Sequence, residues 1–311
     1  MSRANALTYP VAYQPQLVED AVFWALRHRP EAKRFRRERE KLYSLVDEDE
    51  RNAAFERFHQ DWFARLGLDR PLAQALQTWP VVKSRTQRCL VLHARHEKEM
   101  GADLYGEPSD GTAEKSTRQL VVHVTPSLLA QPEPFTTFLA RELLHVGDML
   151  DPAFGYEPDL PPSDLGPAYD HFLRQRYRVV WDLNVDGRLT RSGRLPANVR
   201  HEHWRVFQRH FSGTEAELKR AFTYFFESDR VTHNEIVAFC RAPYKWLGTP
   251  DSARARIGAC SLCGLPSYSL TPSDQALSRA SLQYARAEHP GWVGGPVCPQ
   301  CADLYEAKLL L

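Results

Sequence analysis

The first 85 residues follow a helical pattern of hydrophobic and polar positions. Between positions 16 and 29, apolar residues recur every three or four places and so fall on one face of a helix. These residues are Leu17, Ala21, Val22, Ala25 and Leu26. Similar segments follow at 31–47 and 50–66, and Gly67 is a suitable helix stop. The pattern predicts a helical N-terminal region over residues 1–85.

Beyond this region the pattern changes to short runs of Val and Leu. The segments 89–97 and 119–125 are flanked by Gly, Pro and charged residues, which is typical of β-strands. The polar, turn-rich segment 105–117 between them predicts an exposed loop. A long helix is expected next, over about 135–150.

The second half of the chain is predicted to be mainly helical. A proline-rich connection at 152–167 leads into a helical segment at 168–189. Two further helices are expected at 214–228 and 232–242, because each opens with a Thr followed three residues later by a Glu, the capping-box pattern. The residues concerned are Thr214, Glu217, Thr232 and Glu235. From residue 248 onward, regular periodicity fades.

Composition and charge exclude several classes of protein. At 311 residues and 43% hydrophobic, the chain is long enough to bury a substantial core. Lys and Arg number 40 against 39 Asp and Glu, so no overall field favours nucleic acid or an anionic membrane. No stretch approaches the roughly 18 apolar residues of a membrane span, and the N-terminus has no signal-peptide core. We therefore expect a soluble, cytoplasmic protein.

Four of the six cysteines form two Cys-x-x-Cys pairs, whereas Cys89 and Cys240 stand alone and are expected to be small buried side chains. The paired residues are Cys260 with Cys263 and Cys298 with Cys301. Two such pairs complete a tetrahedral zinc site, whereas a thioredoxin-like redox motif needs one pair beside a βαβ pattern. The tail, 246–311, resembles a zinc ribbon. Because four thiolates fill the site, we expect a structural zinc.

A second candidate site lies in the segment 138–152, FLARELLHVGDMLDP. Residues three and four apart share a helix face, so Glu142 and His145 project together, while Asp148 lies further round, beside the same site. In a metalloprotease HExxH helix, two histidines hold zinc and the glutamate acts as general base on the metal-bound water. Glu142 and His145 fit the base and the second histidine, but Arg141 stands in the place of the first.

Residues 86–190 resemble the zincin metallopeptidases, in particular the gluzincin branch. The resemblance rests on the strand at 119–125, the RELLH helix and the later segment 182-DLNVD-186. It implies an α+β fold, mostly helical, with a small sheet packed on the RELLH helix. It also implies that Asp182 is a third zinc ligand, and that Asp186 orients a ligand without touching the metal.

The sequence departs from the zincin pattern at the metal itself. A guanidinium has no lone pair to offer zinc, so Arg141 cannot act as a ligand. His145 and Asp182 alone would form a weak two-ligand site, with aspartate in place of the usual glutamate. Alternatively, Arg141 replaces the metal's charge by pairing with Glu142, Asp182 and Asp186, which describes a pseudoenzyme. Further candidate ligands are His123, Asp148 and His171.

Two classes of function remain open. The first is a zincin-like metallopeptidase homologue whose degenerate core, 86–245, lies between the helical region 1–85 and the zinc module 246–311, and which is weakly active or inactive. Any activity would be metal-dependent peptide hydrolysis with Glu142 as base. The second is a non-catalytic protein that binds a peptide or protein partner, or nucleic acid. Lesser alternatives are a di-iron carboxylate protein, which needs a second Glu-x-x-His helix, and an ordinary helix carrying RELLH by chance.

Several other signals have simpler interpretations. In 93-HARH-96 and 201-HEHW-204, the paired histidines would face different directions, so we expect surface positions for them. The segment 188–195 is expected to be a charged, solvent-facing turn rather than a phosphate site. The aromatic residues expected to pack in the core are Phe222, Tyr224, Phe225 and Phe226.

Overall fold

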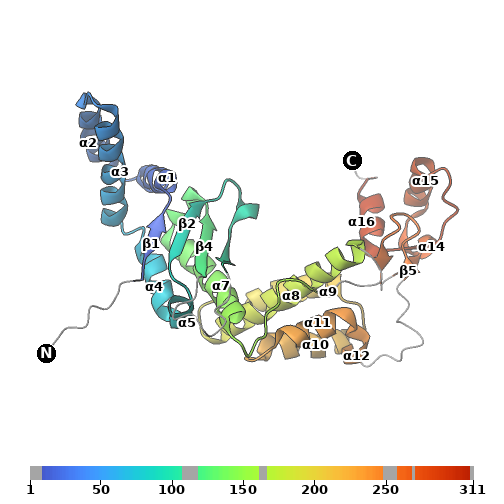
Figure 1. The fold of residues 1–311 in the computed structure, drawn as a ribbon. Coiled ribbons are helices and arrows are strands. Elements are labelled where there is room, and N and C mark those ends of the chain that lie inside the picture. Colours follow the sequence, from blue (N-terminus) through green and yellow to red (C-terminus); the bar gives the residue numbers. More distant parts are fainter. Residues whose placement is uncertain (1–8, 107–117, 161–166, 248–257, 268–269, 309–311) are drawn as a thin grey trace. The chain divides into compact units, whose positions relative to one another are not determined.

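The computed structural model describes residues 9–106, 118–160, 167–247, 258–267 and 270–308 (Figure 1). The chain divides into two compact units. One contains the residues up to Tyr156 together with Gly193–Leu195, and the other contains Glu157–Ser192 and the residues from Pro196 onward. The boundary falls inside the predicted core of residues 86–245, and the three-part division of the chain stays a prediction.

After one short strand, the first unit continues with helices, as the hydrophobic pattern predicts. They are α1 (Pro15–Leu26), α2 (Ala32–Glu40), α3 (Glu48–Arg65), α4 (Arg70–Thr78) and α5 (Pro80–Arg85). The side chain of Asp47 caps α3 by accepting the backbone N–H of Glu50 at 2.8 Å. The chain turns after α3 at Gly67, whose φ of 68° favours glycine. The helix predicted at 31–47 is shorter than expected, since a 3₁₀ segment takes over at Lys41–Ser44.

The unit also contains a four-stranded sheet with the order β1-β2-β4-β3, in which β1 precedes these helices and the other strands follow them (Figure 1). Its strands are β1 (Val11–Tyr13), β2 (Cys89–His93), β3 (Gly101–Tyr105) and β4 (Gln119–Val124). β1, β2 and β4 run parallel, whereas β3 pairs antiparallel with β4 at one edge. Val91 and Val122 face each other in the register of β2 and β4, and both are completely buried. The strand predicted at 89–97 ends at His93, ahead of a 3₁₀ turn at Glu97–Glu99.

The RELLH helix belongs to this first unit. The short helix α6 (Pro126–Leu129) and the long helix α7 (Pro132–Leu150) follow β4. Along one face, α7 places Phe135, Leu139 and Leu143 in the same core as the strands, each with no exposed surface. Helices and a small mixed sheet in one unit confirm the predicted α+β class.

The second unit begins with a group of helices. They are α8 (Pro167–Arg191), α9 (Val199–His210), α10 (Glu215–Glu227), α11 (His233–Arg241) and α12 (Pro243–Leu247). The Thr-x-x-Glu capping boxes predicted for α10 and α11 are both formed. Phe222, Phe225 and Phe226 are buried as predicted, but Tyr224 is 38% exposed. Gly187 allows α8 to approach α10, because a Cβ at that position would collide with the carbonyl oxygen of Phe226.

The C-terminal part of this unit is built from very short strands and small helices. Two antiparallel pairs join β5 (Gly258–Ala259) to β6 (Pro266–Ser267) and β7 (Thr271–Pro272) to β8 (Pro296–Val297). The helices are α14 (Ser273–Ala276), α15 (Arg279–Glu288) and α16 (Pro299–Ala307). In the described part of the chain, no helix combines the length and the apolar character needed to cross a membrane. Of the loop predicted at 105–117, residues 107–117 lie outside the described residues.

Candidate metal centre

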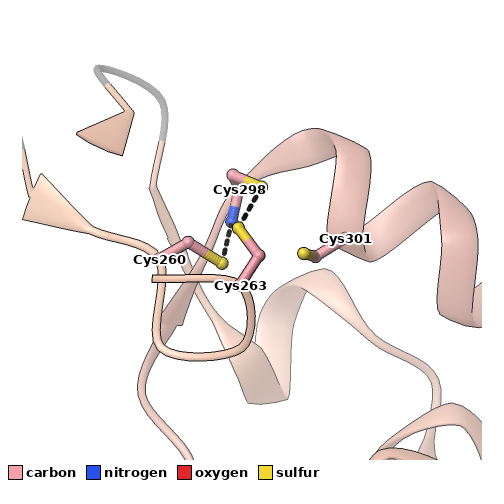
Figure 2. Close-up of side chains that lie close together, drawn as sticks. All are labelled: Cys260, Cys263, Cys298 and Cys301. Carbon is pink, nitrogen blue, oxygen red and sulfur yellow. Dashed lines mark hydrogen bonds between the residues drawn. The ribbon is translucent and has the colours of Figure 1, made fainter. Parts of the chain in front are cut away.

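The first cysteine pair lies in the turn between β5 and β6. The backbone N–H of Cys260 donates to the carbonyl of Leu265 at 2.9 Å, which closes the turn. The N–H of Gly264 donates to the carbonyl of Cys260 at 2.8 Å, and Gly264 has a φ of 72° that few other residues adopt. This tight turn brings the thiols of Cys260 and Cys263 toward each other (Figure 2).

The second pair lies where β8 runs into α16. Cys298 is the N-terminal cap residue of that helix and Cys301 lies in its first turn. The backbone N–H of Ser261 donates to the carbonyl of Pro296 at 2.8 Å, which ties the two pairs together. The N–H of Cys298 also donates to Sγ of Cys260 at 3.3 Å (Figure 2). Hydrogen bonds from the backbone therefore hold the two cysteine pairs next to each other.

The four thiols are spaced as zinc ligands are. We call Cys260, Cys263, Cys298 and Cys301 the four-cysteine cluster. Their Sγ atoms all lie within 4.8 Å of one another, and within the described ranges no other group of three or more His, Cys, Asp or Glu side chains is this close. Cys263 and Cys298 have their Sγ atoms 3.9 Å apart, near the separation of about 3.8 Å expected for tetrahedral ligands about 2.3 Å from zinc. All four are free thiols.

Hydrogen bonds from the backbone favour the thiolate form of Cys260. Burial alone would raise its pKa, but hydrogen bonds from the backbone N–H groups of Cys263, Cys298 and Leu262 lower the pKa to about 7. Burial and the neighbouring thiols instead raise the pKa of Cys298 and of Cys301. Thiolates this close repel one another, and a divalent cation among them would remove that repulsion.

The surroundings of the cluster contain little apolar core. One small core consists of Val297 and three of the four cysteines. A second consists of Leu277, Ala285 and Tyr305. Trp292 packs against both cores, and its indole N–H donates to the hydroxyl of Ser261 at 3.0 Å. Cores this small give little hydrophobic stabilisation, so a metal cross-link would supply a large share of the folding free energy.

Arg141, Glu142 and His145 of RELLH, and Asp148 beyond it, lie on α7 in the first unit. Oε2 of Glu142 accepts the backbone N–H of Ala102 in the edge strand β3 at 2.9 Å. The carboxylate predicted to act as general base therefore accepts a hydrogen bond from the backbone of the sheet. Asp148 is buried, with 6% of its surface exposed. The catalytic and metal-binding roles of these residues stay predictions.

The aspartates of DLNVD lie on α8 in the second unit. Asp186 is 5% exposed, and its Oδ2 lies 2.8 Å from Nε2 of His203 on α9. The surface position predicted for His203 is therefore wrong, because its side chain is only 17% exposed and is hydrogen-bonded to Asp186. His201 is exposed, as predicted. The two-ligand metal site of His145 and Asp182 stays a prediction.

The other candidates have simpler surroundings. Cys89 and Cys240 are 0% and 2% exposed, which confirms that they are buried. Burial raises the pKa of both thiols, to about 12 for Cys89, so neither is a reactive nucleophile. His123 lies on β4, and His171 lies on α8 next to Gln175.

Comparisons with known proteins identify no relative of this chain. No family model, curated protein or solved structure matches it. The resemblance to zincins and zinc ribbons therefore rests on the sequence motifs, and the structure adds the four-cysteine cluster as a possible metal site.

Proposed function

We propose that the C-terminal part of the chain is a zinc-ribbon-like module in which the four-cysteine cluster holds one structural Zn²⁺. The observation that carries this proposal is the convergence of four Sγ atoms within 4.8 Å of one another. Four thiolates would fill a tetrahedral shell, so no position is left for water or substrate. The metal's role would be to hold two small cores together.

For residues 86–245 we propose a zincin-like core that binds a peptide or protein partner and does not hydrolyse it. The elements that the resemblance requires, β4, α7 and α8, occur in the required order. Arg141 cannot supply a metal ligand, and Glu142 already accepts a backbone N–H from β3. β3 is an edge strand, and an edge strand can pair with an extended peptide.

Elemental analysis of the purified full chain tests the zinc module. We expect about one zinc per chain. Cys263→Ser should abolish binding with the least disturbance to packing, because Cys263 is the one exposed member of the cluster. Cys240→Ala is the matched control, since it removes a buried thiol outside the cluster and should keep the zinc. Retention of zinc by Cys263→Ser, or its loss from the control, would contradict the assignment.

A retained core metal is the second candidate, and the same analysis distinguishes it. A working core site would give about two zinc ions per chain, and the second should survive Cys263→Ser but be lost on His145→Ala. Arg141→His restores the HExxH pattern, so a gain of a second zinc in this variant alone would favour a zincin ancestry. Metal-dependent peptide hydrolysis by the wild-type chain that disappears in Glu142→Gln would overturn the non-catalytic assignment.

A further inference from the structure

A pocket of about 380 Å³ opens at the carboxyl ends of two parallel strands in the first unit. Its walls come from three segments that each follow a parallel strand: α1 after β1, the turn after β2, and the turn after β4. In α/β sheets, the edge where parallel strands end is where ligands usually bind, because loops and helix starts converge there. The volume lies within the range of small-molecule sites.

The lining combines exposed aromatic rings with charge. Phe23 and Trp24 are adjacent on α1 and are 39% and 41% exposed, although side chains of this size are usually covered. The guanidinium of Arg27 lies over the Trp24 ring, 3.7 Å from its centroid. A guanidinium stacked in this way keeps its N–H edges available for a second partner.

Two arginines of the lining make no ion pair through their side chains in the part of the chain that the structure describes. Among the described residues, neither Arg27 nor Arg95 makes an ion pair or a side-chain hydrogen bond, and Arg95 contributes only its backbone N–H to Glu99. The one carboxylate in the lining, Asp20, lies 3.7 Å from Nε2 of His93. Within the lining itself, two guanidiniums against one carboxylate leave a surplus of positive charge beside the exposed rings, and Glu99, which attracts Arg95, lies outside the lining.

We propose that this pocket binds a small anion in which a planar apolar ring carries a carboxylate or phosphate group. The ring would pack against Phe23 and Trp24, and the anionic group would accept hydrogen bonds from Arg27 and Arg95. Both parts are needed, because a lone anion leaves the rings exposed and a neutral ring leaves the guanidiniums unpaired.

Titration calorimetry of the full chain with four probes tests the proposal. Phenyl phosphate and benzoate carry a ring and an anion, inorganic phosphate lacks the ring, and benzyl alcohol lacks the charge. We expect binding of phenyl phosphate, benzoate or both at millimolar concentration, and clearly weaker binding of the other two. The aryl anion that binds more tightly identifies the preferred anionic group. No binding by either, or equal binding by benzyl alcohol, would overturn the proposal.

Substitutions then locate the binding site. Arg27→Gln and Arg95→Gln should each weaken binding of the preferred probe by roughly tenfold, because each removes a charge-assisted hydrogen bond. Arg29→Gln is the matched control, since Arg29 is exposed close to the same helix but does not line the pocket. Trp24→Leu should weaken the binding of the aryl anions and leave the binding of inorganic phosphate unchanged. An equal loss in Arg29→Gln, or no loss in either pocket variant, would show that binding lies elsewhere.

Discussion

Asp186 on α8 and His203 on α9 are joined by a 2.8 Å hydrogen bond between Oδ2 and Nε2. The zincin resemblance predicts that Asp186 orients a metal ligand. In the structure, Asp186 forms a hydrogen bond with His203 within the second unit. A buried carboxylate is costly unless it is hydrogen-bonded, so this bond contributes to holding α9 against α8.

Replacement of His203 with Ala should therefore loosen the packing of these two helices. We expect a loss of about 1–3 kcal/mol, because Asp186 loses a partner while remaining buried. Hydrogen exchange of the α8 and α9 amides, followed by mass spectrometry, measures the effect locally. His201→Ala is the control two residues away, on an exposed side chain, and should change protection by less than about 0.5 kcal/mol. Equal effects of the two variants would show that the hydrogen bond contributes nothing.

Two helical glycines should respond in opposite directions to the same substitution. Gly187→Ala forces a methyl group against the backbone of α10, so we expect destabilisation of about 1–3 kcal/mol. Gly147 on α7 has no atom within 4 Å of the Cβ position, so Gly147→Ala should be neutral or stabilise by up to about 1 kcal/mol. Urea unfolding measures both variants. A stabilising Gly187→Ala would show that the close approach of α8 and α10 does not exist.

The features that the sequence predicts are those fixed by neighbours along the chain. The capping box of Thr232 and Glu235 involves residues three apart, and each Cys-x-x-Cys turn is equally local. The strand β1 is only three residues long and pairs with Cys89–Val91, far away in sequence, so no periodicity could reveal it. The bond between Asp186 and His203 also depends on tertiary packing. Local patterns therefore found the four-cysteine cluster but missed half of the sheet.

His59 makes the first unit sensitive to acid. Its ring is 3% exposed and lies among the rings of Phe23, Phe35, Phe55 and Phe58. Burial, together with the nearby Arg39, lowers the pKa of His59 from 6.5 to about 4. The unfolded chain therefore binds a proton more readily, so stability present above pH 6.5 is lost as the pH falls toward 4.

Urea unfolding of the wild type and of His59→Leu at several pH values tests this dependence. The stability difference between neutral pH and the acid range should shrink in the variant by up to about 3 kcal/mol. The comparison uses the change with pH rather than the absolute stability, so any packing effect of leucine cancels. His28→Gln, at an exposed position, should keep the wild-type profile. Identical profiles for the wild type and His59→Leu would refute the assignment.

Under the proposed zinc assignment, Gly295 should control how firmly the C-terminal module holds its metal. Its φ of 144° is one that favours glycine, and a Cβ there would lie 3.0 Å from the Cβ of Ser261, between the two cysteine pairs. Gly295→Ala should therefore strain the backbone that positions the ligands and weaken zinc binding by about 1–3 kcal/mol.

Competition with a chromogenic chelator measures that loss as a shift in apparent zinc affinity. Gly291→Ala is the matched control, because no atom lies within 4 Å of its Cβ position and its φ is not positive. We expect the control to retain wild-type affinity. If both variants keep it, the turn at Gly295 does not position the thiols; if both lose it equally, the effect comes from the loop as a whole. A selective loss in Gly295→Ala would tie metal affinity to the backbone link between Ser261 and Pro296.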